Sequence, residues 1–194
     1  MYRKQQIANI LAFVFMIVMN TLANALPLGG RNTGELSALY PNLFVPAGVT
    51  FSIWGVIYLW LLGFIVYQSR GLFSADQTQI NSYMHERLGY LFVINALANG
   101  SWIVVWHYEY VVLSLVVMLV LLFTLISIIR QLNTGRRAVS IGERWCVHAP
   151  FTIYLGWISI ATIANFTTVL VDSGYDGMPL GEVNWTIFML AVAT

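Results

Sequence analysis

Long apolar stretches separated by short polar segments run through the whole chain. A helix needs about 20 apolar residues to cross the roughly 30 Å hydrocarbon core of a bilayer. Five stretches are long enough and a sixth begins at Trp185, with approximate ranges 7–26, 46–68, 88–106, 110–129, 147–171 and, incomplete, 185–194. The pattern predicts an all-α integral membrane protein, a single transmembrane domain over residues 1–194. We expect the sixth span to be completed by residues beyond 194.

Composition agrees with a membrane protein. Of the 194 residues, 59% are hydrophobic and 9% charged, with a mean hydropathy of +0.75, against roughly 25% charged residues in a soluble domain. Arg3 and Lys4 precede an apolar run too long for a signal peptide and without a small-residue cleavage site, so we interpret it as a retained span. We do not expect nucleic acid as a partner, because the net charge is only +1 and no basic run is interleaved with aromatic residues. The expected partner is membrane lipid.

The basic residues predict the orientation. Cytoplasmic loops of membrane proteins carry an excess of Lys and Arg. With the N-terminus inside, only Arg31 lies outside, and the inner set is Arg3, Lys4, Arg70, Arg87, Arg130, Arg136, Arg137 and Arg144. We therefore expect a cytoplasmic N-terminus, in a plasma (inner) membrane. Spans three and four are joined only by "HYE" and must be antiparallel neighbours.

Polar and aromatic residues form stripes on three predicted helices. An unpartnered amide in hydrocarbon is costly, so asparagines inside spans are expected to face partners. The stripes are Asn9, Phe13, Met16, Asn20 and Asn24 on span one, Asn95, Asn99, Trp102 and Trp106 on span three, and Pro150, Tyr154, Trp157, Ala161, Asn165, Thr168 and Asp172 on span five. Span four offers only scattered Ser114, Thr124 and Ser127, which predicts a packing or lipid-facing helix.

Span two carries large aromatic side chains on two sides. At 100° per residue Phe51, Trp54 and Tyr58 lie on one side, and Trp60, Phe64 and Tyr67 lie roughly opposite. We expect one side to face protein or a ligand and the other to face lipid and the interface. Two interpretations of the stripes stay open: the amides join helices and the rings fill the core, or together they line a pocket for a flat, mostly apolar ligand.

Three short motifs occur in order on successive spans: Pro46 ahead of "WGVIY", then "LANGSW", then "YLGWISIATIAN". With these motifs the chain resembles the TspO/MBR family, the tryptophan-rich sensory proteins that include the mitochondrial translocator protein. The longer first loop and the extra span mark a long, divergent member.

The resemblance implies a TspO-like five-helix transmembrane bundle, here with the start of a sixth helix. It also implies frequent homodimerisation and an aromatic pocket for porphyrins, sterol-like or lipid-like molecules or synthetic aromatic ligands. A porphyrin or haem-like molecule would be a ligand, and no cofactor is required. The expected ligand-binding residues are Phe51, Trp54, Tyr58, Asn95, Asn99, Trp102, Tyr154, Trp157, Ala161 and Asn165.

Catalytic and metal chemistry find little support in the sequence. His85 and His148 belong to the inner side and His107 to the outer side, so they cannot converge on one ion. No acid or lysine lies in the middle of a span to relay protons. We expect a membrane protein that senses or transports a hydrophobic molecule. The alternatives are a small-solute transporter or permease subunit and, third, an enzyme degrading a bound tetrapyrrole.

Overall fold

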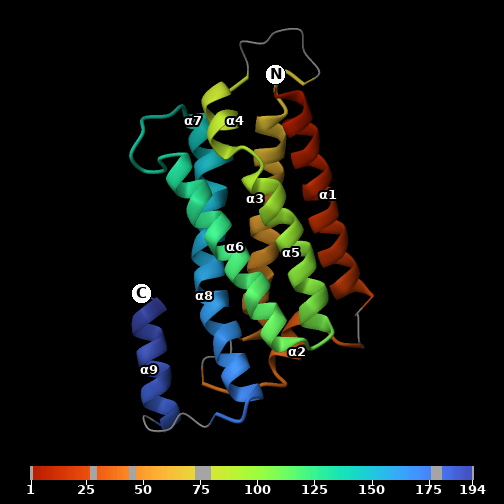
Figure 1. Cartoon of the computed structure of the whole chain (residues 1–194), viewed down its shortest axis with the longest axis vertical. Coiled ribbons are helices and arrows are strands. Elements are labelled where there is room, and N and C mark those ends of the chain that lie inside the picture. The colour runs from red at the N-terminus through yellow and green to blue at the C-terminus, as the bar shows by residue number, and fades with distance from the viewer. Residues whose placement is uncertain (1, 27–29, 44–46, 73–79, 176–180, 194) are drawn as a thin grey trace.

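The computed structural model describes residues 2–26, 30–43, 47–72, 80–175 and 181–193. Every regular element within these ranges is helical, which confirms the all-α prediction. The bundle consists of α1 (Arg3–Ala25), α3 (Ile53–Gln68), α5 (Leu91–His107), α6 (Val111–Gln131) and α8 (Ala149–Asp172) (Figure 1). Pro46, expected to lead into the second span, lies outside the described residues.

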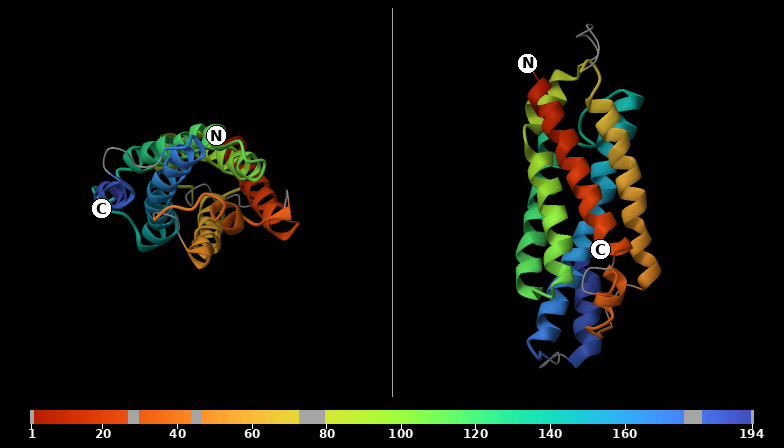
Figure 2. Two further views of the ribbon diagram at one scale, coloured as in Figure 1. Left: turned by 90° about the horizontal axis from the view of Figure 1, so that it is seen from below. Right: turned by 90° about the vertical axis from the view of Figure 1, so that its right-hand side faces the viewer.

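Four of these helices form a curved row in the order α1, α5, α6, α8, each packed closely on the next. The fifth, α3, lies across the concave side of the row, where it contacts α1 and α8 (Figure 2). As expected from their short connection, α5 and α6 are antiparallel neighbours. The interior of the bundle is therefore enclosed by the row on one side and by α3 on the other.

Among the residues that the structure describes, length and composition allow four helices to span a membrane: Arg3–Ala25, Gly48–Gln68, Val111–Gln131 and Ile141–Asp172. A fifth span results if α4 (Ser82–Leu88) and α5 count as one, although they are bent by 54°. The bend falls at Gly89, whose φ of +50° is a conformation that glycine adopts without steric cost. The sequence prediction placed this span at 88–106 without a bend.

The last complete span begins earlier than predicted. It starts with α7 (Ile141–Glu143), continues through one π-helical segment, η4 (Arg144–His148), and runs on as α8. Ser140 caps the start of this helix, its hydroxyl accepting from the Glu143 amide at 3.1 Å. The helix therefore begins six residues before the expected 147.

Short elements cover the end of the bundle opposite the N-terminus. These are α2 (Thr33–Ser37) and the 3₁₀ turn η2 (Gly48–Ser52). A capping box fixes the start of α2, because the Asn32 side chain accepts from the Glu35 amide while the Glu35 carboxylate accepts from the Asn32 amide. The helix α9 (Gly181–Ala193) contacts α8 and begins four residues before the expected Trp185.

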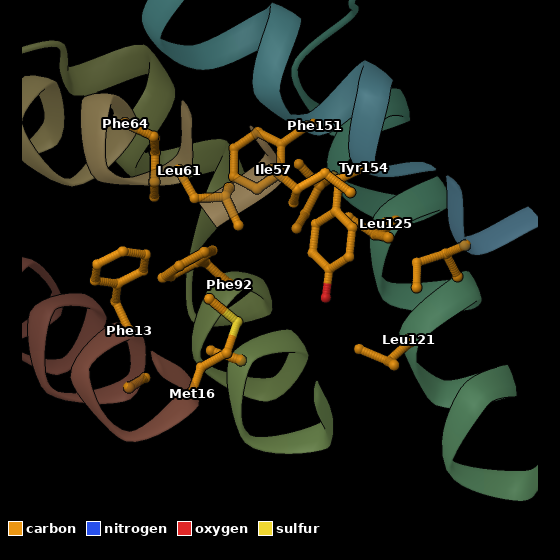
Figure 3. Packing of buried hydrophobic residues seen from close by; sticks show 14 of the residues in the cluster. Phe13, Met16, Ile57, Leu61, Phe64, Phe92, Leu121, Leu125, Phe151 and Tyr154 are labelled. Atoms are coloured by element: carbon orange, nitrogen blue, oxygen red, sulfur yellow. The ribbon is translucent and has the colours of Figure 1, made fainter. Parts of the chain in front are cut away.

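Buried side chains run along the whole bundle, and one cluster in this core brings together aromatic rings from three helices (Figure 3). Phe64 of α3 lies 5.0 Å from both Phe92 of α5 and Phe151 of α8, measured between ring centroids. All three side chains are fully buried. The expectation that Phe64 belongs to one outward stripe with Trp60 and Tyr67 is therefore wrong, because α3 buries part of both sides.

The basic residues gather as the orientation argument requires. The helix ends that carry them, the start of α1, the end of α3, α4, the end of α6 and α7, meet at one end of the bundle. At the opposite end Arg31 Nη1 lies 3.5 Å from Glu109 Oε1. The charge asymmetry is a property of the fold, and its direction relative to a membrane stays a prediction.

Candidate functional site

A cavity with about 410 Å³ of empty space, including its part open to solvent, lies between α3, α5, α6 and α8 near the α2 end. Its walls are mostly aromatic and apolar. The lining residues are Ser37, Phe51, Trp54, Trp102, Trp106, Met118, Trp157, Ala161, Ala164, Asn165 and Thr168. We name it the aromatic cavity.

Trp54 stands at the centre of the aromatic wall. Its ring lies 6.2 Å from Trp102, 5.9 Å from Trp157 and 5.5 Å from Tyr58, by centroid distance. The Trp157 ring is edge-on to both Trp54 and Phe51. These distances and angles are the ones that aromatic pairs prefer, so the rings hold one another in place.

The indole N–H groups of this wall are unequally satisfied. Trp102 Nε1 donates to Asn165 Oδ1 at 3.3 Å. Trp106 Nε1 and Trp157 Nε1 are buried and have no hydrogen-bond partner among the described residues. A buried N–H group without an acceptor costs about 1–3 kcal/mol, and the great majority of such groups are paired. Both residues line the cavity, so their N–H groups are the candidate donors to a ligand there.

Asn99 joins four helices behind that wall. Its Oδ1 accepts from Asn20 Nδ2 of α1 at 2.7 Å and from the Tyr58 hydroxyl of α3 at 3.2 Å. Its Nδ2 donates to the Tyr154 hydroxyl of α8 at 2.6 Å. Asn99 and Tyr154 are completely buried. This network fixes α3, which carries Trp54, against the rest of the bundle.

The helix α6 supplies partners for two other asparagines. Asn165 Nδ2 donates to Ser114 Oγ at 2.9 Å, and Asn95 Nδ2 donates to Thr124 Oγ1 at 2.8 Å. The expectation of a helix with merely scattered hydroxyls is therefore wrong. Ser114 and Thr124 are about 80° apart around the helix at 100° per residue, and both are buried. Only Ser127 is outward, bonded to the carbonyl of Phe123.

The structure brings most of the predicted site residues together. Six of the ten line the aromatic cavity: Phe51, Trp54, Trp102, Trp157, Ala161 and Asn165. Tyr58 lines a neighbouring cavity of about 510 Å³ with Asn20, Asn24 and Thr33, and Phe51 and Trp54 border both. Asn99 and Tyr154 lie behind the wall. Asn95 is placed apart, between α5 and α6.

The inward direction predicted for Asn95, Asn99 and Asn165 is confirmed, since all three are buried. Sequence reasoning placed Trp106 and Thr168 on the right stripes without assigning them to the site. Met118 was missed because α6 was interpreted as a packing or lipid-facing helix. Ser37 belongs to α2, a helix of five residues that is too short for helical periodicity to give a signal.

The electrostatics of the aromatic cavity are simple. Its described lining includes no Asp, Glu, Lys, Arg or His side chain. Tyr40, in the segment before the second span, contacts Trp106 with ring centroids 6.3 Å apart. Burial, and then the carboxylates of Glu109 and Asp172, raise the pKa of Tyr40 above its usual value, so its hydroxyl is neutral at physiological pH. Within the described part of the chain, no group of three His, Cys, Asp or Glu residues could hold a metal ion.

A helical bundle with spans of membrane length and an internal aromatic cavity has the features of an integral membrane protein. The family model described as TSPO-like protein matches residues 6–194, nearly the whole chain, and the chain belongs to that family. The resemblance found in the three motifs is thereby confirmed. Comparison with curated proteins and with solved structures found no match.

Proposed function

We propose that the protein binds a hydrophobic, planar aromatic molecule of porphyrin-, sterol- or lipid-like character in the aromatic cavity, for sensing or transport. The observation that carries the proposal is the pair of unpartnered indole N–H groups of Trp106 and Trp157 in a wall of stacked rings. A flat ligand stacks on the rings, and an acceptor atom on its edge receives the N–H groups. The membrane we propose is the plasma membrane, with a cytoplasmic N-terminus.

Helix packing alone explains the buried asparagines but not the two tryptophan N–H groups. Asn95, Asn99 and Asn165 each bond to side chains of neighbouring helices, as residues that join helices do. Trp106 and Trp157 have the opposite property, because burial removes their N–H groups from water without supplying a described acceptor. Helix packing therefore explains the asparagines. It does not explain the unpartnered N–H groups of the two tryptophans, which we assign to ligand binding.

The composition of the lining favours binding over proton-coupled chemistry. A proton relay within a membrane uses ionisable side chains, and the described lining of the aromatic cavity holds none. Stacking on an indole needs no such group. We therefore place recognition of the molecule first, and movement of the molecule across sealed vesicles would distinguish transport from sensing.

The test is a titration of the purified chain with protoporphyrin IX, cholesterol and a phosphatidylcholine, followed by quenching of tryptophan fluorescence. An aromatic pair contributes about 0.5–1.5 kcal/mol beyond its buried area, and about 1.4 kcal/mol is a factor of ten in Kd. Trp157→Ala removes the ring and the N–H group, so it should raise the Kd of the bound probe about tenfold or more. Trp157→Phe keeps a ring and should lose less, about two- to tenfold for one hydrogen bond.

Phe123→Ala is the matched control, since Phe123 is 62% exposed on α6 and lies away from the cavity. It should leave Kd unchanged. Only variants that keep wild-type helicity in detergent are compared, because removal of a tryptophan leaves a void that destabilises a bundle. Equal affinities for Trp157→Ala and Phe123→Ala would reject the aromatic cavity as the binding site.

A further inference from the structure

A second cavity, with about 900 Å³ of empty space including its open part, lies at the opposite, cation-rich end of the bundle. It is formed by α3, the α6–α7 connection, η4 and the first turns of α8. It shares no lining residue with the aromatic cavity. We name it the basic cavity, because Arg137, Arg144 and His148 line it.

Three buried polar atoms in its lining lack partners. Thr134 Oγ1, Arg137 Nε and His148 Nε2 each make no hydrogen bond to any residue that the structure describes. His148 is only 5% exposed. Its Nε2 lies 3.5 Å from Glu143 Oε1, which is too long for a good hydrogen bond. Burial with no partner is expensive for polar atoms, and three of them around one cavity indicate a ligand that completes their bonding.

The charges around these atoms favour an anion. Arg137 donates to the Glu143 carboxylate and lies 4.2 Å above the ring of Tyr83, so Glu143 offsets its charge. Arg144 is exposed and forms no ion pair with a described residue, which leaves one positive charge unmatched. Arginine, hydroxyl and imidazole groups together are the donors that hold phosphate oxygens.

Apart from Thr152, the rest of the lining is apolar and aromatic. Trp60 of α3 stacks on Trp145 with ring centroids 5.9 Å apart and donates through Nε1 to the Trp145 carbonyl at 2.9 Å. Ala149 and Ile153 of α8 continue the lining. Trp145 follows Arg144 near the start of the span Ile141–Asp172, and a tryptophan beside a basic residue near the end of a span is typical of the level of lipid headgroups. A ligand of this cavity thus has an anionic head and an apolar body.

We propose that the basic cavity binds the phosphate headgroup of an anionic phospholipid, with the acyl chains lying against α3 and α8. Arg144 and the unpartnered Arg137 Nε, Thr134 Oγ1 and His148 Nε2 receive the phosphate. The π-helical turn of η4 carries both Arg144 and His148, and such turns occur frequently at functional sites. The proposal does not depend on a ligand in the aromatic cavity.

The test uses the full chain in a neutral detergent and native mass spectrometry to measure binding of short-chain phosphatidylglycerol. Phosphatidylcholine of equal chain length and inorganic phosphate are the comparison ligands. Phosphatidylglycerol should bind at least about tenfold more tightly than either, because phosphatidylcholine lacks the net charge and free phosphate lacks the apolar body. Equal binding of the two lipids would overturn the proposal, and so would phosphate binding as tightly as phosphatidylglycerol, which would make this a site for free phosphate.

The variants locate the site. Arg144→Gln should weaken phosphatidylglycerol binding about tenfold, and Arg144→Lys, which keeps the charge, should stay within about threefold of the wild type. Arg136→Gln is the matched control: it removes the same charge from an exposed residue of the nearby α6–α7 connection that does not line the cavity. Its effect should not exceed about twofold. Equal losses in the two glutamine variants would show general attraction by the basic end and refute the basic cavity as the site. The comparison of ligands on the wild type needs no variant to fold.

Discussion

Asn99 is the best single position at which to test the polar network, because its side chain bonds to three other helices. Asn99→Leu keeps the branched shape and removes both polar atoms. It separates Asn20 of α1, Tyr58 of α3 and Tyr154 of α8 from their common partner. Asn20 retains a bond to the carbonyl of Met16 at 2.9 Å, so the two tyrosine hydroxyls suffer most.

The expected cost follows from the number of bonds. Side-chain hydrogen bonds between membrane helices average about 0.6 kcal/mol, so three of them amount to about 2 kcal/mol. The value for soluble proteins, about 1 kcal/mol per bond, gives about 3 kcal/mol. We expect Asn99→Leu to lower the free energy of unfolding by about 2–3 kcal/mol.

Unfolding by sodium dodecyl sulfate in mixed micelles, followed by circular dichroism, measures this change. Ser101→Leu is the control, because Ser101 is exposed on the other side of α5 and also becomes leucine. It should change the free energy of unfolding by less than about 0.5 kcal/mol, the usual limit for surface positions. If Asn99→Leu were no more destabilising than Ser101→Leu, the hydrogen-bond network would not contribute to the free energy of unfolding, and our reasoning about buried amides would be wrong.

Two further predictions concern packing and orientation. A Cβ on Gly100 would lie 2.5 Å from the ring of Phe15, so Gly100→Ala should destabilise the α1–α5 contact by about 1–3 kcal/mol in the same assay. In Gly156→Ala the added Cβ meets no described atom within 4 Å, so this change should be neutral or slightly stabilising. A greater destabilisation by Gly156→Ala than by Gly100→Ala would contradict the described packing of α1 on α5. With Cys146 replaced by serine, a cysteine at exposed Ala38 should react with an impermeant reagent outside intact cells, and one at exposed Ala138 only after permeabilisation. Labelling of the second position from outside would reverse the orientation.

The polar stripes were predictable because helical geometry alone fixes them. Asn95 and Asn99 are one turn apart on α5, and a buried amide needs a partner, so both could be placed inside the bundle without knowledge of the partners. The partners themselves could not be found in this way. Ser114 and Thr124 are isolated hydroxyl residues in a helix made largely of Leu, Val and Ile, so few polar positions mark its buried face. Periodicity carries no information when one face hardly differs from another.

Other features depend on neighbours that sequence does not specify. The side chain of Phe64 is buried because Phe92 and Phe151 meet it there, and its position on the helical wheel does not reveal that contact. The bend at Gly89 requires a positive φ. Glycine can adopt this conformation but need not, so its presence in the sequence does not predict a bend. Asn95 was grouped with the cavity because it shares a stripe with Asn99. Four residues nevertheless move a side chain about 6 Å along the helix and turn it by about 40°, and at that position Asn95 meets Thr124 of α6.

The helix α3 is a wall of both cavities at once. Trp54, near its start, borders the aromatic cavity, and Trp60, less than two turns later, borders the basic cavity. A helix this short moves as a rigid rod, so a ligand that tilts α3 at one cavity also changes the shape of the other. Thermodynamic linkage makes this influence reciprocal. If a bound headgroup changes the affinity of the aromatic cavity for its ligand by some factor, that ligand changes the affinity of the basic cavity for the headgroup by the same factor. The lipid composition of one leaflet would thus change the affinity for a ligand that binds near the opposite face of the membrane.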